Sequence, residues 1–251
     1  MIYELEDTSK VQELFGGWNE TLIYSCLQRV MGKIYVTNLE EPESAFAFVG
    51  CFGFFAGVPD RELVLYRPAA FEILTPQNEV WAALIEECYP DAKKVTRFAI
   101  RKDTQFDRER LTRFANILPK GYELRAIDAN LHDQCLKNAF TEDFVSSFGN
   151  KEQYLEYGRG VVIVKNGEIV AGASSYARYK GGIEIEVDTA ESERRKGLAT
   201  AACSALILNC LDEGLYPSWD AQNMDSVRLA EKLGYEFDHA YTAYETFRAK
   251  Q

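Results

Sequence analysis

The stretch Arg194-Arg195-Lys196-Gly197-Leu198-Ala199 decides the fold of this chain, because two different residue patterns meet there. Before it, Ile183-Glu-Ile-Glu-Val-Asp188 alternates strictly between apolar and acidic residues, which predicts a β-strand. After it, residues 198–211 are apolar on most sides, which predicts a buried helix. We therefore expect a tight turn between strand and helix, in which Gly197 supplies backbone angles that other residues avoid.

This turn is predicted to bind an anion. The first N–H groups of a helix have no partner inside the helix, and the helix dipole is positive at that end. Phosphate groups bind at such helix starts, and the turn adds three positive side chains. A pyrophosphate fits this combination best. The predicted contacts are Arg194, Arg195, Lys196, Gly197, Leu198, Ala199 and Thr200.

A second strand and a second helix are predicted to follow. Residues 216–221 have the pattern of a short strand. Asn223-x-x-Ser226 then opens a helix that Gly234 ends, with Asn223 predicted as the residue that caps its start. Strand, turn, helix, strand and helix together form one βαβα unit.

The combination resembles the GNAT superfamily of acetyl-CoA-dependent N-acetyltransferases. The resemblance implies an α/β fold with a mixed, largely antiparallel sheet flanked by helices and split near the cofactor, which is acetyl-CoA as co-substrate. More narrowly, the chain is similar to the subfamily that includes zwittermicin A resistance acetyltransferases, which implies antibiotic inactivation. These resemblances are carried by Thr189-x-x-x-x-Arg194-x-x-Gly197-x-Ala199, by Asn223, Ser226, Leu229, Gly234 and Tyr235, and by Trp18-x-x-Thr21-Leu-Ile and Phe52-Gly-Phe-Phe-Ala56.

The resemblance also implies roles for single residues. The backbone N–H near Thr189 would polarise the thioester carbonyl as an oxyanion donor. Asn223 and Ser226 would contact the pantetheine arm or order the start of their helix.

One departure from the family pattern concerns the proton donor. Many GNAT enzymes carry a tyrosine seven residues after the motif asparagine, as the acid that protonates the leaving thiolate. Ala230 stands at that position here, so the donor is open. Tyr241 and Tyr244 are candidates, and water is a third.

An acidic row on the strand before the turn supplies candidate catalytic bases. Glu184, Glu186 and Asp188 share one face of that strand. A carboxylate there can accept the amine proton and attract a cationic substrate. We expect Glu186 to be the base and Glu184 to be second, although a bulge would exchange the two faces of the strand. Trp219 and Asp220 are expected to line the acceptor pocket, with core packing as the alternative for Trp219.

Composition narrows the class of partner. The net charge is −11, which disfavours nucleic acid and anionic membranes as partners. It favours a small cationic amine as acceptor, although solubility alone explains the acidity equally well. With two histidines and no Cys-x-x-Cys pair, no metal is expected. The six cysteines, without a hydrophobic leader or an apolar run of membrane length, indicate a reduced cytoplasmic protein. A homodimer is compatible with these features.

Two domains are expected, an N-terminal α/β domain over residues 1–119 and the acetyltransferase domain over residues 120–251. Residues 110–124 parallel residues 228–237 in their helix, glycine and Tyr-Glu strand, which suggests that the first domain is a degenerate second copy. Its counterpart of the anion turn is expected at Thr75–Glu79, which lacks glycine and basic residues and should not bind coenzyme A. The alternative is that such helix–strand corners look alike by chance.

Two rival functions remain open. A non-catalytic acyl-CoA-binding protein of the same fold is favoured by the loss of the tyrosine at Ala230. A protein or peptide N-acetyltransferase is the second, if the first 119 residues provide a docking surface.

Overall fold

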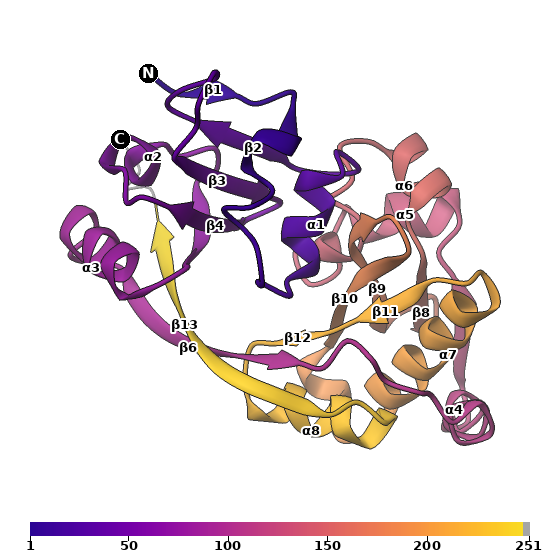
Figure 1. Cartoon of the computed structure of the whole chain (residues 1–251). Helices are drawn as coiled ribbons and strands as arrows, with labels where there is room; N and C mark the ends of the chain where they lie inside the picture. Colours follow the sequence, from indigo (N-terminus) through magenta and orange to yellow (C-terminus); the bar gives the residue numbers. More distant parts are fainter. Residues whose placement is uncertain (248–251) are drawn as a thin grey trace. The chain divides into compact units, whose positions relative to one another are not determined.

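The computed structural model describes residues 1–247 and divides into two compact units. Among the described residues, the first unit contains Met1–Arg97 and residues 240–247, and the second contains Phe98–His239. Both boundaries fall inside long strands, β6 (Lys93–Ile100) and β13 (Phe237–Phe247), so each strand contributes to both units (Figure 1). The second unit is therefore one continuous piece of chain, and the first is made of two pieces.

The second unit is built on a five-stranded sheet with the order β11-β10-β9-β8-β7. Neighbouring strands are antiparallel, except that β10 and β11 run parallel. This mixed, largely antiparallel arrangement confirms the predicted fold class. The strands are β7 (Tyr122–Ala126), β8 (Gly160–Lys165), β9 (Glu168–Tyr179), β10 (Gly182–Thr189) and β11 (Tyr216–Ser218).

Strand β10 shows the alternation that the sequence predicts. Ile183 and Ile185 are buried in the hydrophobic core of the unit, and Val187 packs against it. The acidic residues Glu184, Glu186 and Asp188 alternate with them and therefore lie on the opposite face. The single register shift between β10 and β9 lies opposite Glu184 and Ile185, where β9 contains one additional residue.

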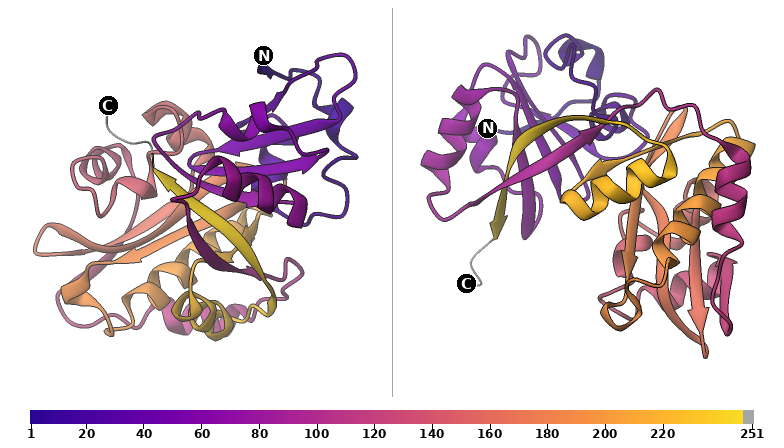
Figure 2. Two further views of the ribbon diagram at one scale, coloured as in Figure 1. Left: turned by 90° about the vertical axis from the view of Figure 1, so that its left-hand side faces the viewer. Right: turned by 90° about the horizontal axis from the view of Figure 1, so that it is seen from below.

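Helices cover both faces of this sheet. Helix α7 packs against β8, β9 and β10, as Figure 2 shows, and its Cys203, Leu206 and Ile207 are fully buried. The segment η2 lies on the other face, because the side of β9 that carries Gly172 faces Phe144 whereas its neighbours Ala171 and Ala173 join the core under α7. The helices of the unit are α4 (Arg108–Ala115), α5 (Ala129–Cys135), the 3-10 turn η2 (Glu142–Phe144), α6 (Lys151–Tyr157), α7 (Leu198–Asp212) and α8 (Met224–Leu233).

The compact units do not coincide with the predicted domains 1–119 and 120–251. Helix α4 belongs to the second unit because Leu111 is fully buried in the same core as α7. The end of β13 belongs to the first unit because Tyr244 pairs with Leu74 there. Both assignments depend on contacts between residues that are distant in the sequence.

The first unit contains strands in the order β1-β2-β3-β4-β5-β13. The stacked rings of Phe46, Phe55 and Trp81 form its centre, with centroid separations of 4.4 Å and 5.1 Å. The phenylalanine-rich segment after residue 44 is therefore part of the core of this sheet. The elements are β1 (Tyr3–Glu4), η1 (Thr8–Val11), α1 (Thr21–Leu27), β2 (Lys33–Val36), β3 (Ser44–Val49), β4 (Phe52–Gly57), α2 (Arg61–Leu65), β5 (Phe71–Pro76) and α3 (Glu79–Cys88).

The two units share an order of elements. Strand β4, helix α2, parallel strand β5 and helix α3 follow one another as β10, α7, β11 and α8 do. Asn78 caps α3 through its side chain, and Asn223 caps α8 in the same way. The segment Thr75–Glu79 therefore corresponds to the start of α8 rather than to the anion turn. The counterpart of the anion turn is the connection between β4 and α2, which corrects the expected equivalence.

Leu111→Ala tests the placement of α4. Removing a buried leucine side chain from the core should lower the free energy of unfolding by about 2–5 kcal/mol. Hydrogen exchange should quicken in α4 and α7, because Leu111 packs in the core that α7 also fills. Exchange that quickens only within residues 1–97 would contradict the division into units.

Candidate active site

The central feature of the second unit is a fork between β10 and β11. Their parallel pairing runs from Gly182↔Tyr216 to Glu184↔Ser218 and ends there. After Ser218 the chain enters β12 (Asp220–Ala221), which pairs with β6 instead. Strand β10 continues to Thr189 in contact with β9. Within residues 1–247, the edge of β10 after Glu184 therefore has no strand beside it on the β11 side.

The open edge of β10 presents particular N–H groups. Ala190 donates its N–H to Val170 of the β9 segment at 2.9 Å, which fixes the alternation of the antiparallel ladder. The N–H groups of Val187 and Thr189 therefore point away from β9, into the fork. Each donates to the carboxylate before it, Val187 to Glu186 at 3.1 Å and Thr189 to Asp188 at 2.6 Å.

The turn after β10 has the conformation that the sequence predicts. A 3-10 segment, η3 (Glu191–Glu193), leads into the turn, and α7 begins at Leu198. Gly197 has φ 80°, in the left-handed region that favours glycine, and Arg195 also lies there with φ 65°. A Cβ added to Gly197 would meet no atom within 4 Å, so the backbone angle, rather than crowding, requires glycine.

The start of α7 presents unpaired N–H groups. Gly197 offers no side-chain cap, and the helical hydrogen bonds begin with the N–H of Ala201 donating to Gly197. Among the described residues, none accepts a hydrogen bond from the N–H groups of Leu198, Ala199 or Thr200. This geometry favours an anion at the helix start.

The three basic residues of the turn are not equivalent. Arg195 is exposed, and its side chain has no hydrogen-bonding partner within the described chain. The Arg194 Nε donates to the carbonyl of Thr189 at 3.3 Å. The Lys196 ammonium donates to Glu193 at 2.6 Å and is already engaged.

The acidic residues of β10 differ in depth. Glu184 is 4 % exposed, at the point where the fork opens. Glu186 is half-buried, and Asp188 is exposed. Burial therefore increases along the row from Asp188 to Glu184, as expected for a path that guides a cationic group into the fork.

Two residues that the sequence reasoning missed lie at the base of the fork. The Tyr179 hydroxyl is 3.0 Å from the Oγ of Ser218, and Ser218 is the register partner of Glu184. The ring reaches this position because Gly182 has no side chain, since a Cβ there would lie 2.2 Å from the hydroxyl. Burial raises the pKa of Tyr179 to about 12, so the hydroxyl keeps its proton at neutral pH. Gly182, which leaves room for the Tyr179 ring, was the one feature of the sequence that pointed to this contact.

Asn223, Ser226 and Trp219 form one structural group. The Asn223 side chain accepts from the N–H of Ser226 at 2.9 Å, which is the predicted helix cap. The Ser226 Oγ accepts from the Trp219 indole at 3.1 Å. Trp219 is 2 % exposed and packs on Tyr235, so it lies in the core and presents no ring face to a pocket. Asp220, beside it on β12, is half-buried.

The tyrosine candidates for the proton donor belong to the first unit, whereas the fork belongs to the second. Ala230 is fully buried in the core of the second unit. Tyr241 and Tyr244 belong to the first unit, where Tyr244 is buried and donates to Glu86 at 2.7 Å.

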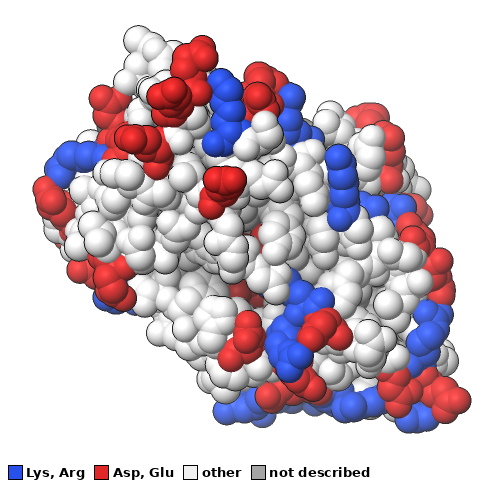
Figure 3. All heavy atoms as spheres, in the orientation of Figure 1, with Lys and Arg blue, Asp and Glu red and all other residues white. Residues whose placement is uncertain are grey.

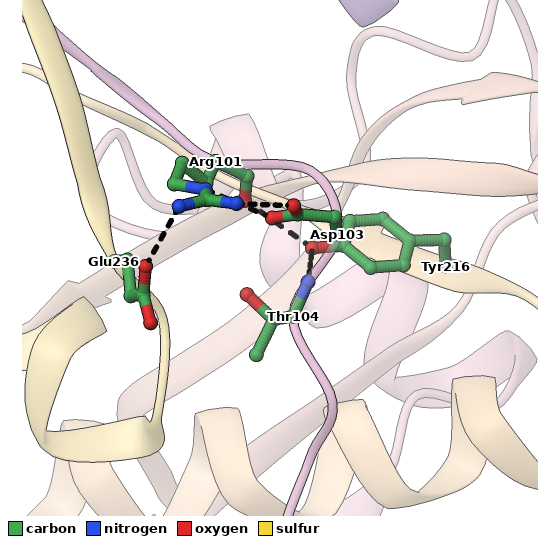
Figure 4. Close-up of polar contacts among 5 residues, drawn as sticks. All are labelled: Arg101, Asp103, Thr104, Tyr216 and Glu236. Atoms are coloured by element: carbon green, nitrogen blue, oxygen red, sulfur yellow. Dashed lines mark hydrogen bonds and ion pairs between the residues drawn. The ribbon is translucent and has the colours of Figure 1, made fainter.

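A polar network holds the chain beside β11. The Tyr216 hydroxyl accepts from the N–H of Thr104 at 3.1 Å and donates to the carbonyl of Arg101 at 3.3 Å (Figure 4). Arg101 also bridges Asp103 and Glu236, the latter at 3.1 Å. These contacts fix the segment that follows β6 and so support the outer arm of the fork.

Within residues 1–247, no cluster of histidine, cysteine and acidic residues has the arrangement of a metal site. In the same part of the chain, no helix has the length and apolar character needed to span a membrane.

Known proteins resemble this chain over most of its length. The model of the GNAT acetyltransferase family matches residues 12–244. An uncharacterized N-acetyltransferase of Bacillus subtilis (strain 168), YdfB, is 24 % identical over 241 residues, covering 89 % of both chains. The crystal structure of a GCN5-related N-acetyltransferase-like protein from Streptococcus suis 89/1591 has a TM-score of 0.91 and 48 % identity, covering 97 % of this chain and 99 % of that one.

A more distant likeness concerns the fold alone. A tandem GNAT protein from the clavulanic acid biosynthesis pathway has a TM-score of 0.56 at 11 % identity, with both chains covered completely. Because the family model spans nearly the whole chain, this protein belongs to the GNAT acetyltransferase family.

Proposed function

We propose that this acetyltransferase transfers the acetyl group of acetyl-CoA to a primary amine of a small, cationic acceptor. The observation that carries the proposal is the fork between β10 and β11 beside an uncapped helix start. The fork offers an extended edge for the pantetheine arm, and the helix start offers N–H groups for the pyrophosphate. Holding both reactants at this edge supplies much of the rate.

The donor is held by the turn and the open strand edge. The N–H groups of Gly197–Thr200 and the free Arg195 side chain bind the pyrophosphate, with Arg194 beside them. The N–H groups of Val187 and Thr189 face the fork, where they donate to the side chains of Glu186 and Asp188. A thioester carbonyl takes the place of one such carboxylate and is polarised there. Asn223 and Ser226 contribute by ordering the start of α8, which Asn223 caps.

The acceptor approaches along the acidic row. We assign Glu186 as the base, directly or through water, because it lies at the open part of the fork and is half-buried. Glu184 is second, with Tyr179 and Ser218 beside it at the base. Asp220 is retained as an acceptor contact, and Trp219 supports it from the core. Displacement of Glu186 from the Val187 N–H by the thioester also frees the carboxylate to take the amine proton.

The distribution of charge supports a proposal for the class of partner. Acidic and basic side chains are intermingled on the face of the molecule in Figure 3, which supports a small acceptor rather than nucleic acid or a membrane surface. We propose that the protein works in the cytoplasm without a metal, and that a homodimer is its assembly. We propose acetyl-CoA as the co-substrate, because the GNAT family generally uses it.

The antibiotic role is a finer proposal that rests on the zwittermicin-type motifs near the N-terminus. Thr21 is the buried first residue of α1, and Phe54 and Phe55 lie in the core of β4. These motif residues therefore build the first unit. We propose an aminopolyol-like antibiotic as the acceptor, with free aminopolyols tested against peptides to separate this role from peptide acetylation.

The first unit is proposed to be a second copy that no longer binds coenzyme A. Its parallel pair β4–β5 is closed at the end, because the Gln77 side chain accepts from the N–H of Gly57 at 3.0 Å and donates to Leu14 at 2.6 Å. The start of α2 is capped by Asp60, which accepts from Glu62 at 2.8 Å. A carboxylate there excludes an anion. We therefore attribute the proposed loss of coenzyme A binding in the first unit to Asp60 and Gln77.

Gly197→Glu is expected to abolish acetyl-CoA binding in calorimetric titration. A side chain at φ 80° strains the turn, and its carboxylate repels phosphate. Gly214→Glu is the matched control, because Gly214 follows the other end of α7 with φ 71° and equally open space. Equal loss in both variants would indicate general damage to α7. Unchanged affinity of Gly197→Glu for acetyl-CoA would show that the turn is not the binding site of the pyrophosphate.

Glu186→Gln is expected to lower kcat about 10²- to 10⁴-fold at neutral pH, as loss of a general base does, with acetyl-CoA affinity retained. Glu184→Gln provides the comparison. A larger loss of turnover in Glu184→Gln than in Glu186→Gln would identify the buried Glu184 as the base instead. Binding of acetyl-CoA without turnover on any amine by the wild type would favour the non-catalytic rival.

The same titration should give one acetyl-CoA per chain, because within residues 1–247 the second unit alone has an open fork. Asp60→Ala leaves the stoichiometry at one, since Gln77 still closes the pair. A stoichiometry of two for the wild type would contradict the assignment.

A further inference from the structure

Glu193 lies beneath the turn and is bound by three groups. Its Oε1 accepts from the Lys165 ammonium at 2.7 Å, and its Oε2 accepts from Lys196 at 2.6 Å and from the Tyr122 hydroxyl at 2.5 Å. Glu193 is only 9 % exposed. We call Tyr122, Lys165, Glu193 and Lys196 the clamp.

The clamp ties the turn to the sheet. Tyr122 begins β7 and Lys165 ends β8, so Glu193 is attached to two neighbouring strands. Lys165 also lies over the Tyr122 ring, 4.9 Å from its centroid. From this anchor the Glu193–Lys196 ion pair spans Arg194 and Arg195, and Arg195 adopts its left-handed conformation within that span. Such a conformation in a non-glycine residue requires support from its surroundings.

The clamp stays charged at neutral pH. The hydrogen bonds from Lys165, Lys196 and Tyr122 lower the pKa of Glu193 to about 2. The same contacts with Glu193 raise the pKa of Lys165 and of Lys196.

We propose that Glu193 is a positioning residue that holds the turn in the shape that receives the pyrophosphate. Lys196 is paired with Glu193 and acts as part of the clamp. The phosphates are then bound by Arg195 and the N–H groups of α7. This inference rests on the proposed function, because it assumes that acetyl-CoA binds at the turn.

Electrostatic repulsion and the clamp predict opposite effects of removing the Glu193 charge. A carboxylate close to a bound anion repels it, so removal of the Glu193 charge should tighten acetyl-CoA binding if the charge were its only effect. The clamp predicts weaker binding, because a neutral glutamine holds the two ammonium groups less strongly and the turn loses its shape. The sign of the change therefore separates the two accounts.

The experiment is calorimetric titration of acetyl-CoA into the wild type and Glu193→Gln, with steady-state kinetics on an accepted amine. We expect affinity to fall about tenfold, and the KM for acetyl-CoA to rise by a similar factor while kcat changes less than about twofold. A purely structural loss would reduce the active fraction, and so lower kcat at unchanged KM.

Glu191→Gln is the matched control. Glu191 lies in the same 3-10 segment and is exposed, so the variant removes an equal charge near the turn without breaking the clamp. Its affinity should equal or slightly exceed that of the wild type. Lys165→Gln should weaken binding as Glu193→Gln does, because Lys165 supports the same carboxylate from β8.

The outcomes are distinguishable from failure of the proposed function. If the wild type does not bind acetyl-CoA, the proposed function fails. If the wild type binds, but Glu193→Gln matches Glu191→Gln or binds more tightly, the clamp is overturned.

Discussion

The early end of the pairing between β10 and β11 is the constraint on which the rest of the site depends. Once Ser218 turns away, the N–H groups of Val187 and Thr189 need other acceptors, and the carboxylates of Glu186 and Asp188 supply them. The next residue, Trp219, is buried, and the chain beyond it pairs with β6 through β12. An unfinished ladder thus leaves polar groups that an incoming ligand can satisfy, at the place where the helix dipole and the acidic row also meet.

The first unit shows what happens when the same arrangement is completed. Gln77 satisfies Gly57 with a side-chain amide, and the indole of Trp81 donates to the carbonyl of Gly57 at 2.9 Å. The helix start is likewise satisfied from within, by Asp60. These internal hydrogen bonds occupy in the first unit the groups that the second unit leaves open, although the two units share one order of elements.

The sequence predicts the parts of this molecule that depend on near neighbours. Gly197, the alternation through Asp188 and the Asn223 cap are local, because periodicity and turn chemistry act over a few residues. The clamp could not be predicted, since Tyr122 reaches Glu193 across 71 residues. The same holds for the Tyr179–Ser218 pair and for Leu111, whose burial moves α4 out of the predicted first domain.

The division of the chain at Arg97 and Ala240 also has a consequence for biosynthesis. The second unit is encoded as an uninterrupted insertion, so all of its strands have been synthesised before the C-terminal half of β13 exists. The first unit, although it begins the chain, must wait for Tyr244 to reach Leu74 before its sheet is complete. On a ribosome, the second unit can therefore fold first, while the edge of β5 stays exposed until Tyr244 and its neighbours in β13 have been synthesised.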